Sequence, residues 1–420
     1  MNTIKNDDML QALDGLVSIN SVSSEPDGIY PFGKGPHDAL DYCLNLCEKF
    51  GFRTKKCAEY MGYAEIGEGD TLMGILAHLD VVPAGNGWTQ DPFRATVVGD
   101  RVYGRGVIDD KGPAISVIYA MKDVLDSGVK LNKRVRLLFG CSEEKGSWED
   151  MAYYKEHEEL PDFGFTPDAD FPLIYAEKGI LGLTLTMDRQ QAGIVNISGG
   201  DAPNMVPSSC TMTYINRKGE TVTLTTKGKS AHGSLPWLGE NAIALAMEQA
   251  DCAYADCYNA LLGKTYDGSL MDCQLSDEQS GAITINPGVI RSDDTHIILA
   301  LDIRYPISFT EEDIISRIQK AAEPYHVTVS RVAGSHSVFL DKNLPFIQNL
   351  LTVYRDVTGD QESEPMVIGG GTYARAMDNI VAFGPLFPGR ECTEHQPDEY
   401  IPTADLYQIR EIYRRAIEHA

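Results

Sequence analysis

The sequence predicts an α/β fold into which a smaller α+β domain is inserted. Two short apolar runs, Leu72–Ala77 and Val135–Phe139, have the length and continuous hydrophobicity of buried strands. A helical pattern, Pro113–Leu125, lies between them. Strands that alternate with helices indicate a central, mostly parallel sheet. From about Gly179 a different order of elements begins, which marks the start of the inserted domain.

The N-terminal segment predicts two amphipathic helices, because apolar side chains recur at spacings of three and four residues. The first set is Met9, Leu10, Leu13, Leu16 and Val17, and the second is Ala39, Leu40, Cys43, Leu44 and Cys47. Two helices are therefore expected before the first buried strand.

The inserted segment has the order β-α-β-β-α-β, which is the plan of ferredoxin-like domains. Its predicted elements are a strand at Thr221–Thr226, a helix at Glu240–Tyr258, strands at Ala282–Ile290 and His296–Ile303, a helix at Thr310–Ala322 and a strand at His326–Val332. After it come a helix at Leu344–Tyr354, a strand at Asn379–Phe383 and a helix at Thr403–Ile417 with Thr403 as its N-cap. We therefore expect residues 1–178 and 335–420 to form one larger domain, interrupted by residues 179–334.

The charge balance restricts the kind of partner. Lys and Arg total 36 while Asp and Glu total 61, so the formal net charge is −25. A field of that sign repels phosphate backbones and anionic headgroups, so we expect no nucleic-acid partner and no membrane partner. The nine cysteines form no CxxC pair and the first twenty residues lack a signal-peptide pattern. A soluble protein of the reducing cytoplasm is expected.

His78 and Asp80 directly follow the run Leu72–Ala77. They lie at the carboxyl end of a predicted strand, where open α/β sheets build their sites. A carboxylate beside an imidazole fixes the tautomer of the ring and raises its basicity as a metal ligand. The alternative is a histidine in a solvated loop, and this tripeptide alone does not distinguish the two.

Asp109 and Asp110 precede a helix whose first turn contains Pro113. Asp is a common N-cap, and one carboxylate would satisfy that alternative. Two adjacent carboxylates flanked by three glycines favour a metal ligand, because carboxylate oxygens can bridge two cations.

Glu143 and Glu144 form a second acidic pair, just after the run Val135–Phe139. Neighbouring carboxylates repel each other unless cations or protons neutralise them. One glutamate could bind a metal ion while the other transfers protons. Acidic residues continue as far as Glu159, so a solvated helix start is the alternative.

Two weaker candidates complete the donor set. Asp168 lies in a turn between Pro167 and Pro172, and His395 lies in the segment Glu394–Asp398. Together with the earlier acids and His78, they form a nitrogen and oxygen donor set that suits two divalent ions. Zinc is favoured, with manganese or cobalt as alternatives.

Further polar candidates lie in and after the inserted segment. His232 lies on the Gly-rich segment Gly228–Ser234, where it can move and donate a hydrogen bond. Arg304 ends a predicted strand; it is either a surface charge or a planar fork for a substrate carboxylate. Gly369–Thr372 opens a predicted helix whose start could bind an anion. It lacks the GK[ST] ending of a phosphate loop, which disfavours a nucleotide site.

These segments resemble the co-catalytic zinc metallopeptidases, a family that includes peptidase V type dipeptidases, carnosinase, aminoacylase-1 and succinyl-diaminopimelate desuccinylase. The matching segments, in family order, are His78–Asp80, Gly104–Pro113, Ser142–Gly146, Thr166–Pro172, Gly228–Ala242 and Gly369–Arg375 with His395. The resemblance covers nearly the whole chain. It implies a zinc-peptidase-like catalytic domain with a ferredoxin-like lid inserted at residues 179–334.

The resemblance implies a ligand for each metal position. One zinc is implied to be held by His78, Asp110 and Asp168, and the other by Glu144, His395 and the bridging Asp110. Asp109 resembles the family residue that precedes this bridge through a cis peptide.

The resemblance also implies roles for residues that do not bind metal. Asp80 would orient His78, Glu143 would act as the general base, and His232 would hydrogen-bond the developing oxyanion. The implied binders of the substrate's terminal carboxylate are Asn204, Arg304, Gly370, Gly371 and Thr372.

The expected activity is that of a metal-dependent dipeptidase, because the form Asp109–Pro113 is similar to that of the dipeptidase and carnosinase branch. An N-acyl amino-acid deacylase or a desuccinylase is the alternative with the same chemistry. A more distant alternative is a non-catalytic homologue that binds metal or peptide, which would be expected to have lost Glu143 or a ligand. The inserted segment is intermediate in length between the lids of the dimeric deacylases and of the peptidase V type, so both a monomer and a homodimer remain open. In a dimer, His232 would act across the interface.

Overall fold

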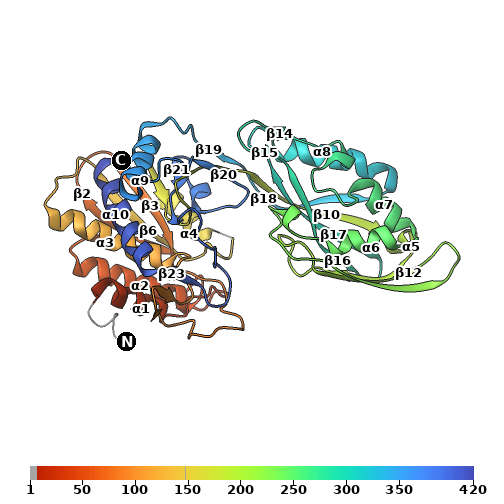
Figure 1. Ribbon diagram of the computed structural model, residues 1–420, viewed down its shortest axis with the longest axis horizontal. Helices are drawn as coiled ribbons and strands as arrows, with labels where there is room; N and C mark the ends of the chain where they lie inside the picture. Colours follow the sequence, from red (N-terminus) through yellow and green to blue (C-terminus); the bar gives the residue numbers. More distant parts are fainter. Residues whose placement is uncertain (1–6, 147) are drawn as a thin grey trace. The chain divides into compact units, whose positions relative to one another are not determined.

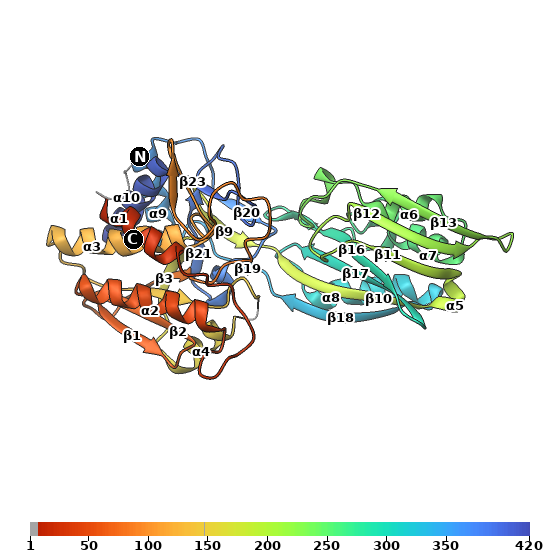
Figure 2. The same ribbon diagram turned by 90° about the horizontal axis from the view of Figure 1, so that it is seen from below.

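The computed structural model describes residues 7–146 and 148–420. The chain forms two compact units (Figures 1 and 2). Unit 1 comprises Met1–Tyr175, Leu340–Met366 and Thr372–Ala420, and unit 2 comprises Ala176–Phe339 and Val367–Gly371. Residues 367–371, assigned from sequence to the larger domain, group with unit 2. They are tied to it because the Lys178 N–H donates to the Ile368 carbonyl and Arg304 donates to the Gly369 carbonyl.

The largest sheet has nine strands, and its strands from β1 to β21 belong to unit 1. In sheet order they are β1 (Arg53–Cys57), β2 (Met61–Gly67), β6 (Arg134–Gly140), β3 (Leu72–His78), β7 (Phe163–Thr166), β21 (Ile380–Ala382), β9 (Ile174–Glu177) and β19 (Val338–Phe339), with β20 (Met366–Ile368) paired to β9. The four central strands, β6, β3, β7 and β21, are parallel, and the outer pairs are antiparallel. Every residue of β3 is buried, as expected of a parallel strand covered on both faces.

Helices cover this sheet. They are α1 (Asp8–Val17), α2 (Lys34–Lys49), α3 (Lys111–Ser127), α4 (Glu149–His157), α9 (Pro345–Thr358) and α10 (Thr403–His419). The last helix, α10, packs against α3 and α9 (Figure 1). Smaller elements of unit 1 are β4 (Thr96–Val98), β5 (Arg101–Tyr103), β8 (Ala169–Asp170), β22 (Pro385–Leu386), β23 (Tyr400–Pro402) and the 3-10 helix η5 (Tyr373–Ala376). The predicted α/β class with a central parallel set of strands is confirmed.

Unit 2 is built on a seven-stranded antiparallel sheet. In sheet order its strands are β13 (Thr221–Lys227), β12 (Ser209–Ile215), β11 (Ile194–Gly199), β16 (Thr284–Ser292), β17 (His296–Tyr305), β10 (Gly179–Asp188) and β18 (Thr328–Ser335). Further elements are α5 (Arg189–Ala192), α6 (Ala242–Gln249), α7 (Ala253–Leu261), α8 (Glu311–Ala322), β14 (Ser276–Asp277), β15 (Gly281–Ala282), η2 (Pro236–Leu238), η3 (Ser269–Met271) and η4 (Glu323–Tyr325). Helices α6, α7 and α8 lie on one face of the sheet (Figure 2), and β10 accordingly alternates between buried and half-buried residues.

Three local expectations were wrong. The single helix expected at Glu240–Tyr258 is two helices, α6 and α7, which are separated by residues 250–252; Ala250 and Cys252 are both extended. Thr403 is the first residue of α10 rather than its cap, because Pro402 occupies the cap position. The segment after Gly369–Thr372 is only a four-residue 3-10 helix, η5.

The break between α6 and α7 is not marked in the hydrophobic pattern. Both α6 and α7 bury apolar residues in the same core, so the hydrophobic pattern continues across the break without a Gly or Pro to interrupt it. Strands β10, β11 and β12 also lie in this unit and enlarge its sheet beyond the four strands expected. Among the described residues, no helix is both long and apolar enough to cross a membrane.

Candidate metal centre

The carboxyl ends of three neighbouring parallel strands meet at one edge of the unit 1 sheet. His78 ends β3, the acidic pair Glu143–Glu144 follows β6, and Asp168 follows β7. His78 is fully buried, whereas the side chain of His395, on the loop before β23, is 55% exposed. The edge therefore has a buried side and an open side.

Asp109 lies between two groups of potential metal ligands. Its Oδ1 is 2.8 Å from Nε2 of His78, and its Oδ2 is 2.9 Å from Nε2 of His395. The first group is His78, Asp109 and Asp168, and the second is Asp109, Glu144 and His395; in each, the donor atoms lie within 4.8 Å of one another. A carboxylate shared by two such groups is the arrangement of a dinuclear site.

The structure places Asp109, rather than the Asp110 expected from the resemblance, between the two donor groups. Asp110 belongs to neither donor group, and its Oδ2 accepts a hydrogen bond from the backbone N–H of His78 at 3.1 Å. It occupies the cap position of α3, and the peptide bond that joins it to Asp109 is cis, as expected from the resemblance. The sequence presents two adjacent acids, and nothing local indicates which carboxylate faces the site.

The donor side chains perturb one another's pKa values. Burial acts to raise the pKa of Asp109, but its hydrogen bonds with His395 and His78 outweigh burial and lower that pKa. Burial raises the pKa of Glu144 to about 7, and the Asp109 charge adds to this rise. Burial, followed by the Asp109 charge, also raises the pKa of Asp168. Hydrogen bonds with Asp109 and Glu144 raise the pKa of His395 to about 11.

This electrostatic pattern fits a cation site. The carboxylates are crowded in a poorly solvated place, and protons on His78 and His395, whose pKa values are both raised, would partly offset their repulsion. Divalent cations would replace those protons and neutralise the same charges. The donors are imidazole nitrogens and carboxylate oxygens, which suit zinc, manganese or cobalt.

Asp80 supports the centre in two ways. Its backbone carbonyl lies 2.9 Å from Nδ1 of His78, which directs Nε2 of that ring toward Asp109. Its carboxylate is 3.6 Å from Nδ1, beyond hydrogen-bonding distance, so the expected contact with the ring is made by the carbonyl. The two carboxylate oxygens instead accept the backbone N–H groups of Glu143 and Glu144, each at 3.1 Å.

Glu143 is beside both donor groups but belongs to neither. Burial raises its pKa well above the usual value, and the His78 charge opposes this rise. The charges of Asp168, Glu144 and Asp109 also act on it. A carboxylate that is close to the ligands without being one of them has the position of a proton carrier.

Two buried acids that position the centre were not identified from the sequence. Glu399 is fully buried and accepts hydrogen bonds from the Arg105 guanidinium and from the backbone N–H groups of Gly106 and Ile108, the latter two at 2.9 and 3.0 Å. It therefore holds the loop that leads to Asp109.

The second such acid is Asp150, which is fully buried in α4. Its Oδ2 accepts the backbone N–H groups of Cys141 and Ser142 at 2.6 and 3.0 Å and the Tyr373 hydroxyl at 2.6 Å. It holds the turn that carries Glu143 and Glu144. No local pattern marks either acid, because their partners lie as far as 294 residues away in the chain.

Other predicted site residues are brought together within unit 2. The Gly233 N–H donates to the Asn204 carbonyl at 2.7 Å, and Nδ1 of His232 lies 2.7 Å from the Ser234 hydroxyl. The buried Arg304 donates from Nε to Asp302 at 3.0 Å and from one terminal nitrogen to the Gly369 carbonyl at 2.6 Å.

The glycine segment completes this group. A Cβ on Gly369 would lie 3.0 Å from Cβ of Ser234, so this segment approaches the loop that carries His232. Gly370 and Gly371 belong to unit 2, whereas Thr372 belongs to unit 1 and caps η5 by accepting the Ala374 N–H at 3.1 Å.

Carboxylates and imidazoles gathered at the carboxyl edge of an α/β sheet are the donor set typical of metal-dependent hydrolases. The chain belongs to the peptidase family M20/M25/M40, whose model matches residues 74–419.

Two bacterial relatives have names that begin "Putative dipeptidase". The one from Staphylococcus haemolyticus is 36% identical over 454 residues, which cover 97% of this chain and 96% of the relative. YtjP from Bacillus subtilis is 35% identical over 454 residues, which cover 98% of this chain and 97% of the relative. The crystal structure of human carnosine dipeptidase 1 matches with a TM-score of 0.63 at 16% identity, over 99% of this chain and 96% of that one. At that identity the likeness is one of fold.

Proposed function

We propose that the protein is a metal-dependent dipeptidase whose two-ion site is centred on Asp109. The observation that supports this most strongly is the position of the Asp109 carboxylate, with one oxygen 2.8 Å from the His78 ring and the other 2.9 Å from the His395 ring. His78 and Asp168 would complete one ion position, and Glu144 and His395 the other. The names of the bacterial relatives support a dipeptide as the substrate.

Zinc is the proposed ion, with manganese or cobalt as alternatives, because the donors are imidazoles and carboxylates. When bound, the two metal ions would polarise the scissile carbonyl and supply a water nucleophile with a pKa of roughly 7. The chain's own residues provide the rest of the chemistry.

Glu143 is the proposed general base. Its carboxylate lies beside the donor groups, and its backbone N–H is held by Asp80 at 3.1 Å, which limits the directions it can take. It would accept the proton of the attacking water and then deliver it to the leaving amine nitrogen. Proton transfer of this kind contributes about 100- to 10,000-fold to a rate.

Residues of unit 2, together with Thr372 of unit 1, are proposed to bind the substrate. His232 would hydrogen-bond the oxyanion, a contact that supports catalysis when it is preorganised. Asn204, Arg304 and the Gly370–Thr372 segment would bind the terminal carboxylate. Arg304 supports this role because an arginine has five N–H donors, of which its contacts with Asp302 and Gly369 use two.

We further propose that the enzyme is cytoplasmic and acts on small dipeptides, without nucleic-acid or membrane partners, as a monomer or a homodimer. The net charge of −25 supports the absence of polyanionic partners. The nine cysteines are free thiols, eight of them buried, which supports a reducing compartment.

A substrate panel tests the proposed activity. Purified protein is supplied with zinc, manganese or cobalt and assayed against dipeptides, N-acyl amino acids and N-succinyl amino acids, with metal-free protein as the control. We expect the highest kcat/KM for dipeptides and loss of turnover when the metal is removed. Turnover of the acyl compounds alone would identify a deacylase, and metal binding without any turnover would identify a non-catalytic homologue.

A further inference from the structure

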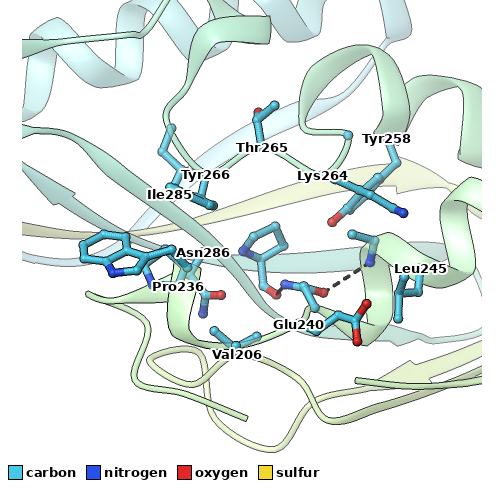
Figure 3. Close-up of a pocket in the computed structure, with 16 residues that line it drawn as sticks. Val206, Pro236, Glu240, Leu245, Tyr258, Lys264, Thr265, Tyr266, Ile285 and Asn286 are labelled. Atoms are coloured by element: carbon cyan, nitrogen blue, oxygen red, sulfur yellow. Dashed lines mark hydrogen bonds between the residues drawn. The ribbon is translucent and has the colours of Figure 1, made fainter. Parts of the chain in front are cut away.

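Unit 2 contains a cavity of about 250 Å³ (Figure 3), and the residues that line it include none of the donors of the metal centre. Its walls come from α6, α7, the η2 turn and β16, all within that unit. Apolar side chains such as Val206, Leu245 and Ile285 line much of it. The volume is below the range of roughly 300–1,000 Å³ that is typical of drug-sized ligands, so the occupant must be small.

The floor of the cavity has two buried polar atoms that need a partner. Tyr258 is 2% exposed, and its hydroxyl has no hydrogen-bond partner among the described residues. Figure 3 shows this hydroxyl pointing from α7 toward the middle of the cavity. Burying a polar group without a partner is unfavourable, so a ligand that accepts a hydrogen bond there would gain affinity.

Asn286 provides the second atom. Its side-chain nitrogen donates to the carbonyls of Pro203 and Met205, each at 2.9 Å, and these two acceptors determine which way the amide is oriented. Its Oδ1 is buried and has no partner within the part of the chain that the structure describes. The cavity therefore offers an acceptor at Asn286 and a donor at Tyr258.

The rim of the cavity is aromatic and carries both signs of charge. Trp237 and Tyr266 are 50% and 39% exposed, and their ring centroids lie 5.9 Å apart. Glu240 supplies a carboxylate, and Lys264 supplies an ammonium group that forms an exposed ion pair with Glu248. Such pairs are weak, so the ammonium group can also contact a ligand anion.

The polar atoms, charges and apolar walls of the cavity are complementary to a zwitterion that carries an apolar group. Glu240 and Asn286 each offer an acceptor for an ammonium group, and Tyr258 and Lys264 each offer a donor for a carboxylate. An apolar or aromatic side chain would pack against Trp237 and the aliphatic walls. We propose that this cavity is a binding site for a free amino acid with an apolar or aromatic side chain.

Backbone hydrogen bonds connect two residues of the cavity wall, Glu240 and Val206, to the segment that carries His232. Lys229 and Glu240 exchange backbone hydrogen bonds at 2.8 and 2.9 Å, and the Val206 N–H donates to the Ala231 carbonyl at 2.8 Å. An occupant that contacts Glu240 and Val206 therefore contacts the same short segments that carry His232 and Asn204. Because amino acids are the products of a dipeptidase, the site would sense product; this last point rests on the proposed function, whereas binding does not.

Fluorine NMR on the full-length protein tests the site. The chain has 3 tryptophans, so 5-fluorotryptophan labelling gives few signals, and Trp237→Phe assigns the one at the cavity. We expect a saturable shift of that signal with L-phenylalanine or L-leucine. Phenethylamine, which lacks the carboxylate, and 3-phenylpropionate, which lacks the amine, should each bind about tenfold more weakly.

Variants separate this site from the metal centre. Tyr258→Phe and Glu240→Gln should each weaken binding about tenfold, whereas Glu278→Gln, which neutralises an exposed carboxylate away from the cavity, should not. Binding should persist in Asp109→Asn, so loss of peptidase activity and loss of this site are distinguishable. The proposal is overturned if no amino acid gives a saturable shift at millimolar concentration or if both cavity variants bind like the parent. Equal binding of the amine or acid analogue would exclude the zwitterion.

Discussion

Replacing Glu143 with glutamine is expected to lower kcat for a dipeptide by about 100- to 10,000-fold while the bound metal remains. The change removes the group that accepts the proton of the attacking water. It removes no ligand, because Glu143 lies outside both donor groups. The backbone contact of residue 143 with Asp80 does not depend on its side chain. Steady-state kinetics and metal analysis on the same sample measure both quantities.

Glu156→Gln is the matched control, because Glu156 is an exposed glutamate on the neighbouring helix α4. It should retain the parent kcat and metal content. A Glu143→Gln enzyme that keeps its metal and works at the parent rate would rule out Glu143 as the base. One that loses its metal would indicate that Glu143 is a ligand instead.

Replacing Asp109 with asparagine should lower metal binding and activity, whereas the same replacement at Asp110 should not. Asp109→Asn removes the carboxylate shared by both donor groups. Loss of a residue that only supports a ligand costs about 10- to 100-fold in metal affinity or activity, so loss of this ligand should reach or exceed the upper end of that range. Metal analysis after dialysis and kcat/KM for a dipeptide measure the effect.

Asp110→Asn should keep both ions and most of the activity. Burial and the Asp168 charge raise the pKa of Asp110 well above its usual value, so its surroundings favour an uncharged side chain. An asparagine oxygen can still accept the backbone N–H of His78, which Asp110 accepts at 3.1 Å. Circular dichroism confirms that each variant folds. Loss of metal in Asp110→Asn but not in Asp109→Asn would restore the assignment made from the sequence.

The pair illustrates what sequence reasoning can reach at this site. The hydrophobic runs that became β3 and β6 are continuous because both faces of each strand are covered, so the strand ends and the residues after them were predictable. The candidates His78, Glu144, Asp168 and His395 all contribute to the two donor groups. The choice between adjacent acids depends on backbone directions that the local pattern does not encode.

The two buried acids that position the centre could not be predicted from the sequence, for a different reason. Glu399 binds the loop before Asp109 through a partner 294 residues away, and Asp150 joins the turn before Glu143 to Tyr373, 223 residues away. The local sequence around a buried acid does not distinguish it from an exposed one, because its role depends on which distant hydrogen-bond donors the fold brings to it. The break between α6 and α7 was not predicted either, because both helices bury apolar residues in the same core and the hydrophobic pattern continues across the break.

The most direct measurement is the return of activity as zinc is added back to metal-free protein. Hydrolysis of a dipeptide is followed while zinc is titrated in sub-stoichiometric steps. Full activity is predicted only when about two ions per chain are bound, one for each donor group around Asp109. Full dipeptidase activity without metal, or a plateau after a single equivalent that a second does not raise, would contradict the two-ion site.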